Sequence, residues 1–500
     1  MVAAMKNLIA TLSLIALLGG CADMGHIQPR ATALDADTLS GGAQFARNVA
    51  ANTWPCERWW QAYHDPQLDA LIQRALQDSP GLREAYARSR QAASMTGLAE
   101  AAGKPTLEAK MSLRRELFSE HDFIPAPEAG NYAWYNRVAL EAGYDLDLWG
   151  KHRDALAASL AEKQVADAEA QLARLTLEQA IVRSYVDLSL AHTLKDMAEE
   201  RLVHRKQAVA VMHRRLTAGL ASEVEATQLD ATLPPLQLEI ENQEERITLL
   251  HNRLAALTGQ APQAGEHIQR PAMQLADANN LALPSNLPAD LLGRRPDVQA
   301  SRWSVEAAAR EINVAKAAFY PDINLRAFIG FQAIGFGRFL GGESSVRGVG
   351  PAISLPIFDG GALRANLGAR TAAYDAAVER YNSTLLHALE SVAGRLTVSQ
   401  SVARQLQLNS KALATAERTR MLAQKGVAAG MTDYLVLLDS EVNLLARQQD
   451  QARLVARQLE SYAELMLALG GGIQPQVSAS SVPTETSNYS STLTGKAGQS

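Results

Sequence analysis

The 500-residue sequence predicts an α+β membrane protein built as a tandem structural repeat, in which each half sets two β-strands between long helices. Three observations support this fold class. Similar segments recur at nearly constant spacing: Pro80 and Pro296 lie 216 residues apart, and Gly219 and Gly430 lie 211 apart. Four segments of about ten residues alternate apolar and polar side chains. Helical patterns far longer than those of ordinary globular proteins separate these segments.

The composition narrows the possible function classes. The net charge is −5, so nothing predicts nucleic-acid binding. Aromatic residues make up only 5 % of the chain, which suits long packed helices better than a large conventional core. After the N-terminal segment, no run of about 18–20 apolar residues occurs, so we expect no membrane-spanning helix in the mature chain.

The N-terminus has the features of an export signal. Lys6 precedes the apolar run Leu8 to Leu18, and the stretch "LLGGC" ends at Cys21. This stretch resembles a bacterial lipobox, which implies a diacylglycerol and an N-acyl chain such as palmitate on Cys21. The alternative is an ordinary signal peptide with an incidental cysteine. Ala22 stands where an aspartate would resemble the signal for retention in the inner membrane, so sorting to the outer membrane is favoured. Cys56, the other cysteine, is expected to be a small, half-buried structural residue.

The first half contains two segments with the alternation of a β-strand, 106–116 and 137–148. The second half repeats the pattern in 322–331 and 348–357. The length of each segment matches a tilted membrane-spanning strand, and aromatic residues gather near the ends, as at membrane interfaces. The predicted apolar faces consist of Leu107, Ala109, Met111 and Leu113; Val138, Leu140, Ala142, Tyr144, Leu146 and Leu148; Ile323, Leu325, Ala327, Ile329 and Phe331; and Val349, Ile353, Leu355 and Ile357.

Four such strands predict an oligomer. A half-buried soluble sheet has the same alternation, but two hairpins separated by long helices would leave exposed edges to protect. In a membrane an open edge is excluded, because no water satisfies its backbone groups. Four strands are also too few to close a barrel, so several copies must share one. A homotrimer would give a twelve-stranded barrel around a polar lumen.

Long helical segments follow each strand pair. Lys151 to about Leu216 contains no proline or glycine and would extend on the order of 100 Å. The chain is then expected to turn and return over 223–257, with a kink at Pro234 and Pro235. The second half repeats this arrangement from Ala362 to Gln424 and returns over 434–469. Such helices would continue the wall of the lumen beyond the membrane.

Glycine and proline mark the expected passages between strand and helix. Gly150, Gly360 and Gly361 supply permissive dihedral angles where a strand leads into a helix, and Pro105 and Pro321 mark the passage from helix into strand. The predicted segments are a signal peptide (1–20), a lipidated segment (21–65), a helix (66–105), a β-hairpin (106–149), tunnel helices (150–259), a connecting equatorial segment (260–288), a second helix (289–321), a second hairpin (322–359), further tunnel helices (360–470) and a disordered tail (471–500).

Several motifs together resemble the TolC-like family of outer membrane factors, in its lipoprotein branch typified by NodT and OprM. They are "LLGGC", "WWQAYHDPQLDALIQRAL", "YDLDLWGKHR", "RRPDVQAS", "AKAAFYPDINL" and "PIFDGG". The resemblance implies a homotrimeric efflux duct in the outer membrane of a Gram-negative bacterium, associated with multidrug resistance. It also implies partners: outer membrane lipids, a periplasmic adaptor (membrane fusion protein), and an inner-membrane pump of the major facilitator or RND type. The loop "FIPAPEAG" is similar to relatives paired with major facilitator pumps.

The resemblance further implies a periplasmic gate. Leu435 and Asp439 share a helix face just beyond the Gly430 turn. The family position of Asp439 faces the channel axis, where a trimer would form a ring of three carboxylates able to bind a multivalent cation. The alternative is a solvated, outward-facing aspartate. Val436 and Val442 replace charged residues found in some relatives, so the locking chemistry differs here.

The two turns between tunnel helices are the expected adaptor-docking tips. They are formed by Ala218, Gly219 and Leu220, and by Ala429, Gly430 and Met431. A purely structural role of the glycines as helix caps is the alternative. Three chains with two tips each would offer six docking sites, which matches the hexameric adaptors of the family.

No enzymatic activity is expected. The sequence lacks the G-x-S-x-G, H-E-x-x-H, Walker A and C-x-x-C motifs, and we expect no metal site or cofactor beyond the lipid on Cys21. The remaining alternative is a structural outer-membrane lipoprotein with a periplasmic coiled coil.

Overall fold

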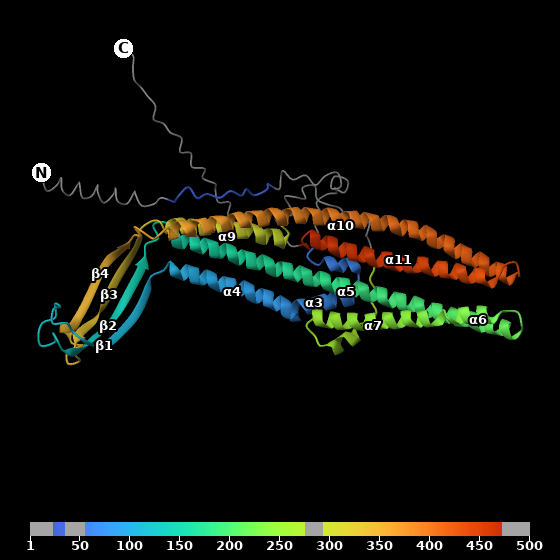
Figure 1. The fold of residues 1–500 in the computed structure, drawn as a ribbon, viewed down its shortest axis with the longest axis horizontal. Coiled ribbons are helices and arrows are strands. Elements are labelled where there is room, and N and C mark those ends of the chain that lie inside the picture. Colours follow the sequence, from blue (N-terminus) through green and yellow to red (C-terminus); the bar gives the residue numbers. More distant parts are fainter. Residues whose placement is uncertain (1–23, 36–55, 276–293, 473–500) are drawn as a thin grey trace, which may run out of the picture.

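The computed structural model describes residues 24–35, 56–275 and 294–472. The protein is elongated, with a β-sheet at one end and two helical hairpin tips at the other (Figure 1). The predicted signal peptide, Cys21 and nearly all of the predicted C-terminal tail lie outside the described residues, as does the part of the predicted connecting segment from 276 to 288.

The four strands form one antiparallel sheet in the order β1-β2-β3-β4. They span Thr106–Leu117 (β1), Tyr132–Asp145 (β2), Asp322–Ile334 (β3) and Ser345–Ser354 (β4). The pairing between β2 and β3 joins segments almost two hundred residues apart in the sequence, with Leu140 opposite Ile329. The outer edges of β1 and β4 have no partner strand within the described chain.

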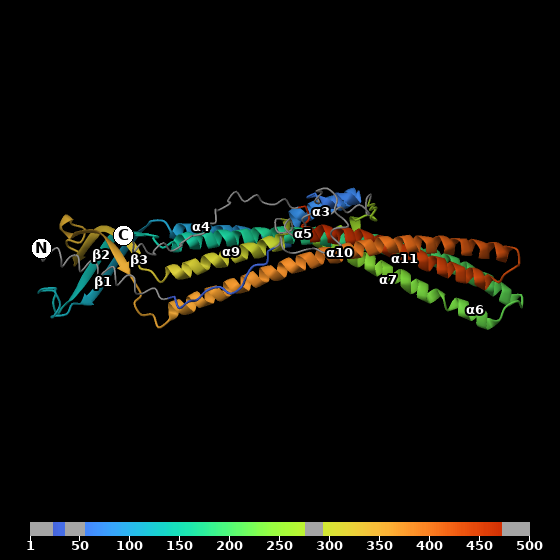
Figure 2. The ribbon, with the colours of Figure 1, turned by 90° about the horizontal axis from the view of Figure 1, so that it is seen from above.

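Helices lead toward the sheet and away from it in each half of the chain. Helices α4 (Pro80–Ala102) and α9 (Pro296–Ala317) precede β1 and β3, and each begins with a proline at its first position, where no backbone N–H is needed. Helices α5 (Lys151–Thr217) and α10 (Ala362–Ala428) follow β2 and β4 and have 67 residues each, which corresponds to about 100 Å. Figure 2 shows the four helices continuing from the sheet.

The returning helices complete two helical hairpins. Helix α11 (Tyr434–Ala468) packs along α10, and α6 (Glu223–Asp230) and α7 (Leu233–Leu257) pack along α5. The expected kink at Pro234 is a complete break between α6 and α7. Proline at the first positions of a helix is tolerated because those N–H groups lack intrahelical partners, so the chain restarts a helix there.

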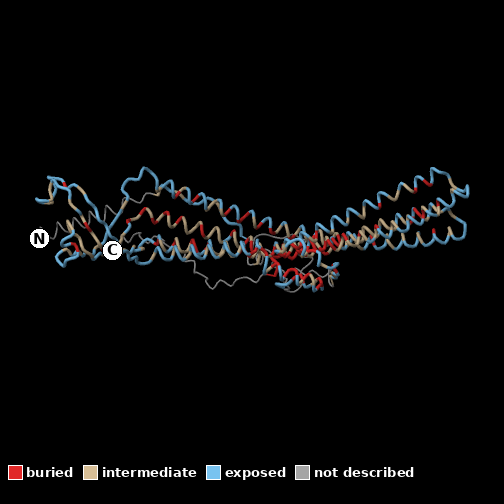
Figure 3. Tube along the Cα trace, turned by 90° about the horizontal axis from the view of Figure 1, so that it is seen from below, coloured by how far each residue is buried: buried red, intermediate tan, exposed pale blue. Residues whose placement is uncertain are grey.

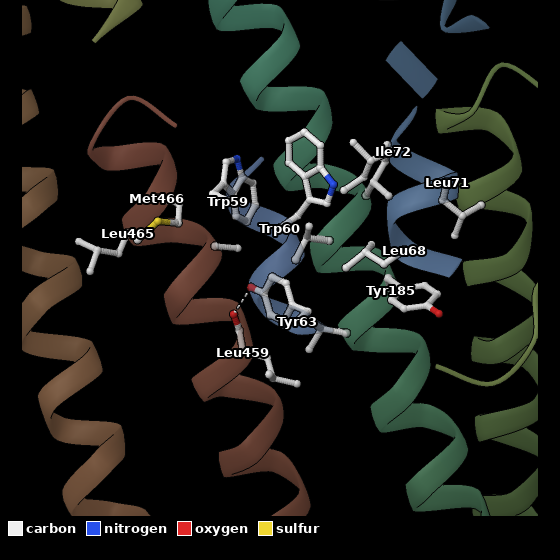
Figure 4. Close-up of a cluster of buried hydrophobic side chains, with 14 of the residues drawn as sticks. Trp59, Trp60, Tyr63, Leu68, Leu71, Ile72, Tyr185, Leu459, Leu465 and Met466 are labelled. Atoms are coloured by element: carbon white, nitrogen blue, oxygen red, sulfur yellow. Dashed lines mark hydrogen bonds between the residues drawn. The ribbon is translucent and has the colours of Figure 1, made fainter. Parts of the chain in front are cut away.

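The main hydrophobic core lies midway along the molecule, where buried residues concentrate (Figure 3). Here the short helices η2 (Trp59–Tyr63) and α3 (Pro66–Asp78) pack against α5 and α11 (Figure 4). Tyr63 is fully buried and donates a hydrogen bond of 2.7 Å to the Leu459 carbonyl. Burial raises the pKa of Tyr63 well above its ordinary value. These residues form the largest cluster of buried apolar side chains in the described part of the chain, which we call the central belt.

Several strand and helix limits differ from prediction. The segment predicted as 137–148 begins at Tyr132 and ends at Asp145, so Leu146 and Leu148 lie outside the strand. Likewise β4 ends at Ser354, before Leu355 and Ile357. The apolar alternation of the sequence continues past the strand ends, but these residues belong to the junctions with the helices, where strand pairing stops. Helix α10 extends to Ala428, beyond the expected end at Gln424.

Two further findings concern the membrane and the cysteine. Among the described residues, no helix is both long and apolar enough to cross a bilayer. Cys56 is exposed, so the prediction of a half-buried residue was wrong. It lies at the start of the described segment, three residues before the buried Trp59, where the chain has not yet entered the core.

Candidate functional site

The register of the sheet separates its two faces. Leu107 pairs with Ala142, Ala142 with Ala327, and Ala327 with Val349, so these four side chains lie on one face. The remaining residues of this face follow at every second position, and most are apolar. Large side chains on it are exposed in the single chain: Leu107 at 71 % and Val349 at 77 %. We call this surface the apolar face. It is as apolar as a surface that lies buried against lipid or protein, yet nothing in the described part of the chain covers it.

The opposite face of the sheet is polar. Lys110 Nζ lies 3.0 Å from carboxylate oxygens of both Glu108 and Glu141, and Arg137 lies 2.9 Å from Glu141. Four basic and five acidic side chains share this polar face, so neither sign of charge dominates it. They are Lys110, Arg114, Arg137 and Arg326, and Glu108, Glu116, Glu141, Asp145 and Asp322.

The first junction between sheet and helix is capped by an aspartate. Gly150 adopts φ +78° immediately before α5, a left-handed conformation that favours glycine. The Asp147 carboxylate accepts hydrogen bonds from the backbone N–H groups of His152 (3.1 Å) and Arg153 (2.9 Å). These are two of the donors that a helix N-terminus leaves without partners. Asp147, predicted as a polar strand residue, therefore caps α5, and a connection of five residues separates β2 from α5.

The second junction has a similar construction. Gly360 and Gly361 adopt φ +66° and +89° before α10. The Asp359 carboxylate accepts hydrogen bonds from the backbone N–H groups of Leu363 (2.6 Å) and Gly361 (2.9 Å). These two donors, chiefly Leu363, lower the pKa of Asp359. Both junctions thus combine an αL glycine with a carboxylate cap, which lets a helix start within a few residues of a strand end.

An aromatic contact links the two halves of the chain at the junction. The Trp149 and Tyr320 rings stack with centroids 4.6 Å apart, and Trp149 Nε1 donates a hydrogen bond of 2.9 Å to the Pro321 carbonyl. Pro321 and Pro105 directly precede β3 and β1, where their fixed backbone geometry suits the change from helix to strand. The contact therefore fixes the start of β3 against the start of α5.

The two helical tips have the same backbone geometry. In each, a glycine with φ near +68° follows the helix end, and two backbone hydrogen bonds close a Schellman motif. In the first tip, the Gly219 N–H donates to the Leu216 carbonyl (3.0 Å) and the Leu220 N–H to the Arg215 carbonyl (2.8 Å). In the second tip, the Gly430 N–H donates to the Val427 carbonyl (3.1 Å) and the Met431 N–H to the Gly426 carbonyl (2.9 Å). Both tips expose their predicted docking residues: Ala218, Gly219, Leu220, Ala429, Gly430 and Met431.

The predicted gate residues lie on α11 close to the second tip. Leu435 and Asp439 are both exposed in the single chain. Asp439 lines a groove of about 550 Å³ between α10 and α11, together with the basic residues Lys411 and Arg447, but Leu435 does not. Neither basic residue was predicted as part of the gate region: Lys411 belongs to α10, the other helix of this hairpin, and Arg447 lies eight residues after Asp439 on α11.

An extended N-terminal strap, residues 24–35, lies along α10 (Figure 1). The Asp375 carboxylate accepts hydrogen bonds from the backbone N–H groups of Arg30 (2.9 Å) and Ala31 (3.0 Å). Asn382 holds the next part of the strap by accepting from the Leu34 N–H at 2.8 Å. Met24 and Ile27 pack onto a hydrophobic cluster at the sheet end of α10. Residue 24 therefore lies near the junction with the sheet.

A buried ion pair in the central belt was not predicted. Glu178 accepts hydrogen bonds from Arg174 Nε (2.9 Å) and Trp59 Nε1 (3.2 Å), and its side chain is 1 % exposed. Burial raises the pKa of Glu178 to about 7, against the opposing influence of Arg174. The spacing of Arg174 and Glu178 by four residues was visible in the sequence, whereas the approach of Trp59 across 119 residues was not.

Comparison with known proteins agrees with this architecture. A profile of the family described as "outer membrane efflux protein" matches residues 71–260 and 287–471. The chain is 41 % identical over 367 residues to the fusaric acid resistance protein FusA of Burkholderia cepacia, covering 73 % of this chain and 69 % of FusA. It is 31 % identical over 435 residues to the multidrug resistance outer membrane protein MdtP of Escherichia coli K12, covering 85 % of this chain and 88 % of MdtP.

Solved structures give the same result. The crystal structure of the outer membrane protein VceC from Vibrio cholerae superposes with a TM-score of 0.78 at 34 % sequence identity, covering 84 % of this chain and 100 % of VceC. The outer-membrane channel OprN superposes with a TM-score of 0.77 at 26 % identity, over 90 % and 98 % of the two chains. The chain therefore belongs to the outer membrane efflux protein family and is an outer-membrane channel component of an efflux system.

Proposed function

We propose that three copies of this chain form one continuous duct, with a twelve-stranded barrel in the outer membrane above a helical tunnel. The observation that carries this proposal is the sheet itself. Its apolar face is exposed, and within the described part of the chain no strand pairs with the outer edge of β1 or of β4. Lipid can cover an apolar face, but it cannot satisfy a strand edge. Pairing β4 of one copy with β1 of the next satisfies both edges and leaves the polar face toward the lumen.

The aromatic residues of β2 support a membrane-spanning position for the sheet. Trp134 and Tyr144 lie on the apolar face ten residues apart, which corresponds to roughly 34 Å along the strand. With the strand tilt usual in barrels, this separation becomes about 25 Å across the membrane. That height matches the apolar band of outer-membrane barrels, which aromatic residues border on both sides.

The repeated element order supports a tandem structural repeat. Helix α4, strands β1 and β2 and helix α5 are followed by α9, β3, β4 and α10 in the same order, and the family profile matches the chain twice. Six pseudo-equivalent units around one axis would then build the trimeric duct. The polar face carries charges of both signs, which suits a water-filled passage for varied small compounds.

The tips and the gate belong to the opposite end of this duct. The exposed Schellman turns at Gly219 and Gly430 would dock a periplasmic adaptor, which connects the duct to an inner-membrane pump of the major facilitator or RND type. Leu435 and Asp439 would form the periplasmic gate near these tips. Three copies of Asp439 around the axis would repel one another and would attract a multivalent cation.

A lipid on Cys21 would anchor each copy in the outer membrane. Supporting this proposal, Met24 packs at the sheet end of α10, and Cys21 precedes Met24 by only three residues in the sequence. An acyl chain carried there would reach the inner leaflet without displacing the strap.

The exported compounds are drugs or other small toxic compounds, in keeping with the resistance functions named for the relatives FusA and MdtP. The experiment that tests the duct combines native mass spectrometry with planar-bilayer conductance. A complex of three chains that conducts ions supports the proposal. A purely structural lipoprotein would give no conductance, and a monomer or dimer would contradict the shared barrel.

A further inference from the structure

The apolar face of the sheet carries an unexpected pair of charges. Within β1–β4, which the structure describes completely, Arg115 and Arg347 are the only charged side chains on this face. Arg115 pairs with Trp134 across β1 and β2, and Arg347 pairs with Ile329 across β3 and β4. The residues paired with them on this face, Trp134 and Ile329, are therefore aromatic and apolar. Two charges of one sign on a face that is otherwise largely apolar call for a partner of opposite charge.

Both arginines lie at the end of the sheet distant from the helices. Arg115 is two residues before the end of β1 at Leu117, and Arg347 is two residues after the start of β4 at Ser345. Both side chains are exposed. An arginine near a strand end can extend its guanidinium toward the membrane surface while its aliphatic part stays in the apolar layer.

Neither guanidinium forms an ion pair within the described part of the chain. Arg115 instead lies 5.9 Å above the ring of Tyr132, which orients it without neutralising its charge. The adjacent Arg114 points to the opposite face, where it lies over Tyr135 and 4.0 Å from Glu116. The contrast between neighbouring residues of one strand shows that acidic partners were available only on the polar face.

We propose that Arg115 and Arg347 bind the phosphate groups of anionic lipids in the outer leaflet. The inference rests on the proposed trimer in one respect. Arg115 is on β1 and Arg347 on β4, the two edges that would meet between copies, so the pair would form at each of three seams. Phosphate is the chemistry that fits, because guanidinium groups bind it bidentately and the apolar surroundings suit the acyl chains below it.

The test titrates purified protein with diphosphoryl lipid A and measures bound lipid by native mass spectrometry. Arg115→Gln and Arg347→Gln are each expected to weaken binding about tenfold, because each removes a charge-assisted hydrogen bond. Arg347→Lys should retain more binding than Arg347→Gln. Arg114→Gln is the matched control, since it removes the same charge from the other face, and it should bind as the unaltered protein does.

Three outcomes would overturn the site. In the first, the double variant binds lipid A normally. In the second, Arg114→Gln loses as much binding as Arg115→Gln. In the third, inorganic phosphate at the same concentration as the lipid displaces all bound lipid A, which indicates a site for free phosphate. The chain count from the same spectra separates this proposal from the duct. Trimers with normal lipid binding in the double variant would refute the arginine site alone, whereas the absence of trimers would refute the proposed function.

Discussion

The indole ring of Trp149 stacks on Tyr320 at 4.6 Å with an angle of 18° between the rings, although the two residues belong to different halves of the chain. The Trp149 Nε1 group also donates a hydrogen bond to the Pro321 carbonyl. One side chain thus joins the N-terminal end of α5 to the start of β3.

The first prediction concerns this contact. Trp149→Leu should lower the free energy of unfolding by about 2 kcal/mol, because it removes both the ring stacking and the hydrogen bond. Trp149→Phe keeps the stacking and should cost about 1 kcal/mol. Thermal unfolding in detergent measures both changes. Equal losses for the two variants would show that the stacking contributes nothing.

The second prediction concerns Glu178 and pH. Its pKa is about 7 in the folded chain, above the ordinary value of 4.5, so between these pH values the folded state holds a proton that the unfolded state has released. The free energy of unfolding should therefore fall as the pH rises from 4.5 to 7, by about 3 kcal/mol in total from this group. Glu178→Gln should remove this dependence, whereas Glu84→Gln, at an exposed site, should keep it. Identical pH profiles for unaltered protein and Glu178→Gln would contradict the assignment.

The third prediction concerns the tips. Ala218→Arg and Ala429→Arg should abolish export while trimers and conductance persist, because the substitutions add bulk and charge to exposed turns far from the sheet. Ala218→Ser and Ala429→Ser add neither and should export normally. Cysteines at Leu220 and Met431 provide the direct measurement, since they should cross-link to the adaptor. Cross-linking only from positions in the middle of the tunnel would exclude docking at the tips.

The fourth prediction concerns the gate. Asp439→Ala should raise the resting conductance or abolish block by divalent cations, because it removes the carboxylate from the proposed ring. Glu441→Gln is the control: Glu441 lines a different groove, which α11 forms with α5 and α10. The measurement is single-channel conductance with and without divalent cations. Unchanged values for both properties would leave Asp439 as a solvated surface residue.

The fifth prediction concerns the anchor. Cys21→Ser should abolish lipid attachment but leave the barrel able to insert, because four strands per copy bury far more apolar surface than one or two acyl chains. Mass spectrometry of the mature N-terminus measures the modification. Native protein with an unmodified Cys21 would refute the lipidation.

Much of the fold was predictable because its signals are periodic and local. The alternation in β1 and β3 and the long helices α5 and α10 are encoded by side chains a few residues apart, and the observed limits differ by a few residues at most. The errors arose where periodicity outlasts the structure. Leu146 and Leu148 continue the strand pattern of β2, yet the chain there must turn so that Asp147 can cap α5.

In the functional region too, features that depend on local sequence were predictable and contacts between distant residues were not. The glycines at 150, 219, 361 and 430 were identifiable, because positive φ angles strongly favour this residue. Contacts over long sequence distances were not identifiable. Nothing local indicates that Trp59 reaches Glu178, that Asp375 holds the N-terminal strap, or that Lys411 shares a groove with Asp439.

The open edges of β1 and β4 have a genetic consequence. If three copies complete one another's sheet, a copy with a damaged edge spoils the assembly that it joins. In a cell that makes intact and damaged chains in equal amounts, random association leaves only roughly one complex in eight wholly intact. Edge mutations in either strand should therefore act dominantly, whereas mutations that prevent a chain from associating at all should be recessive.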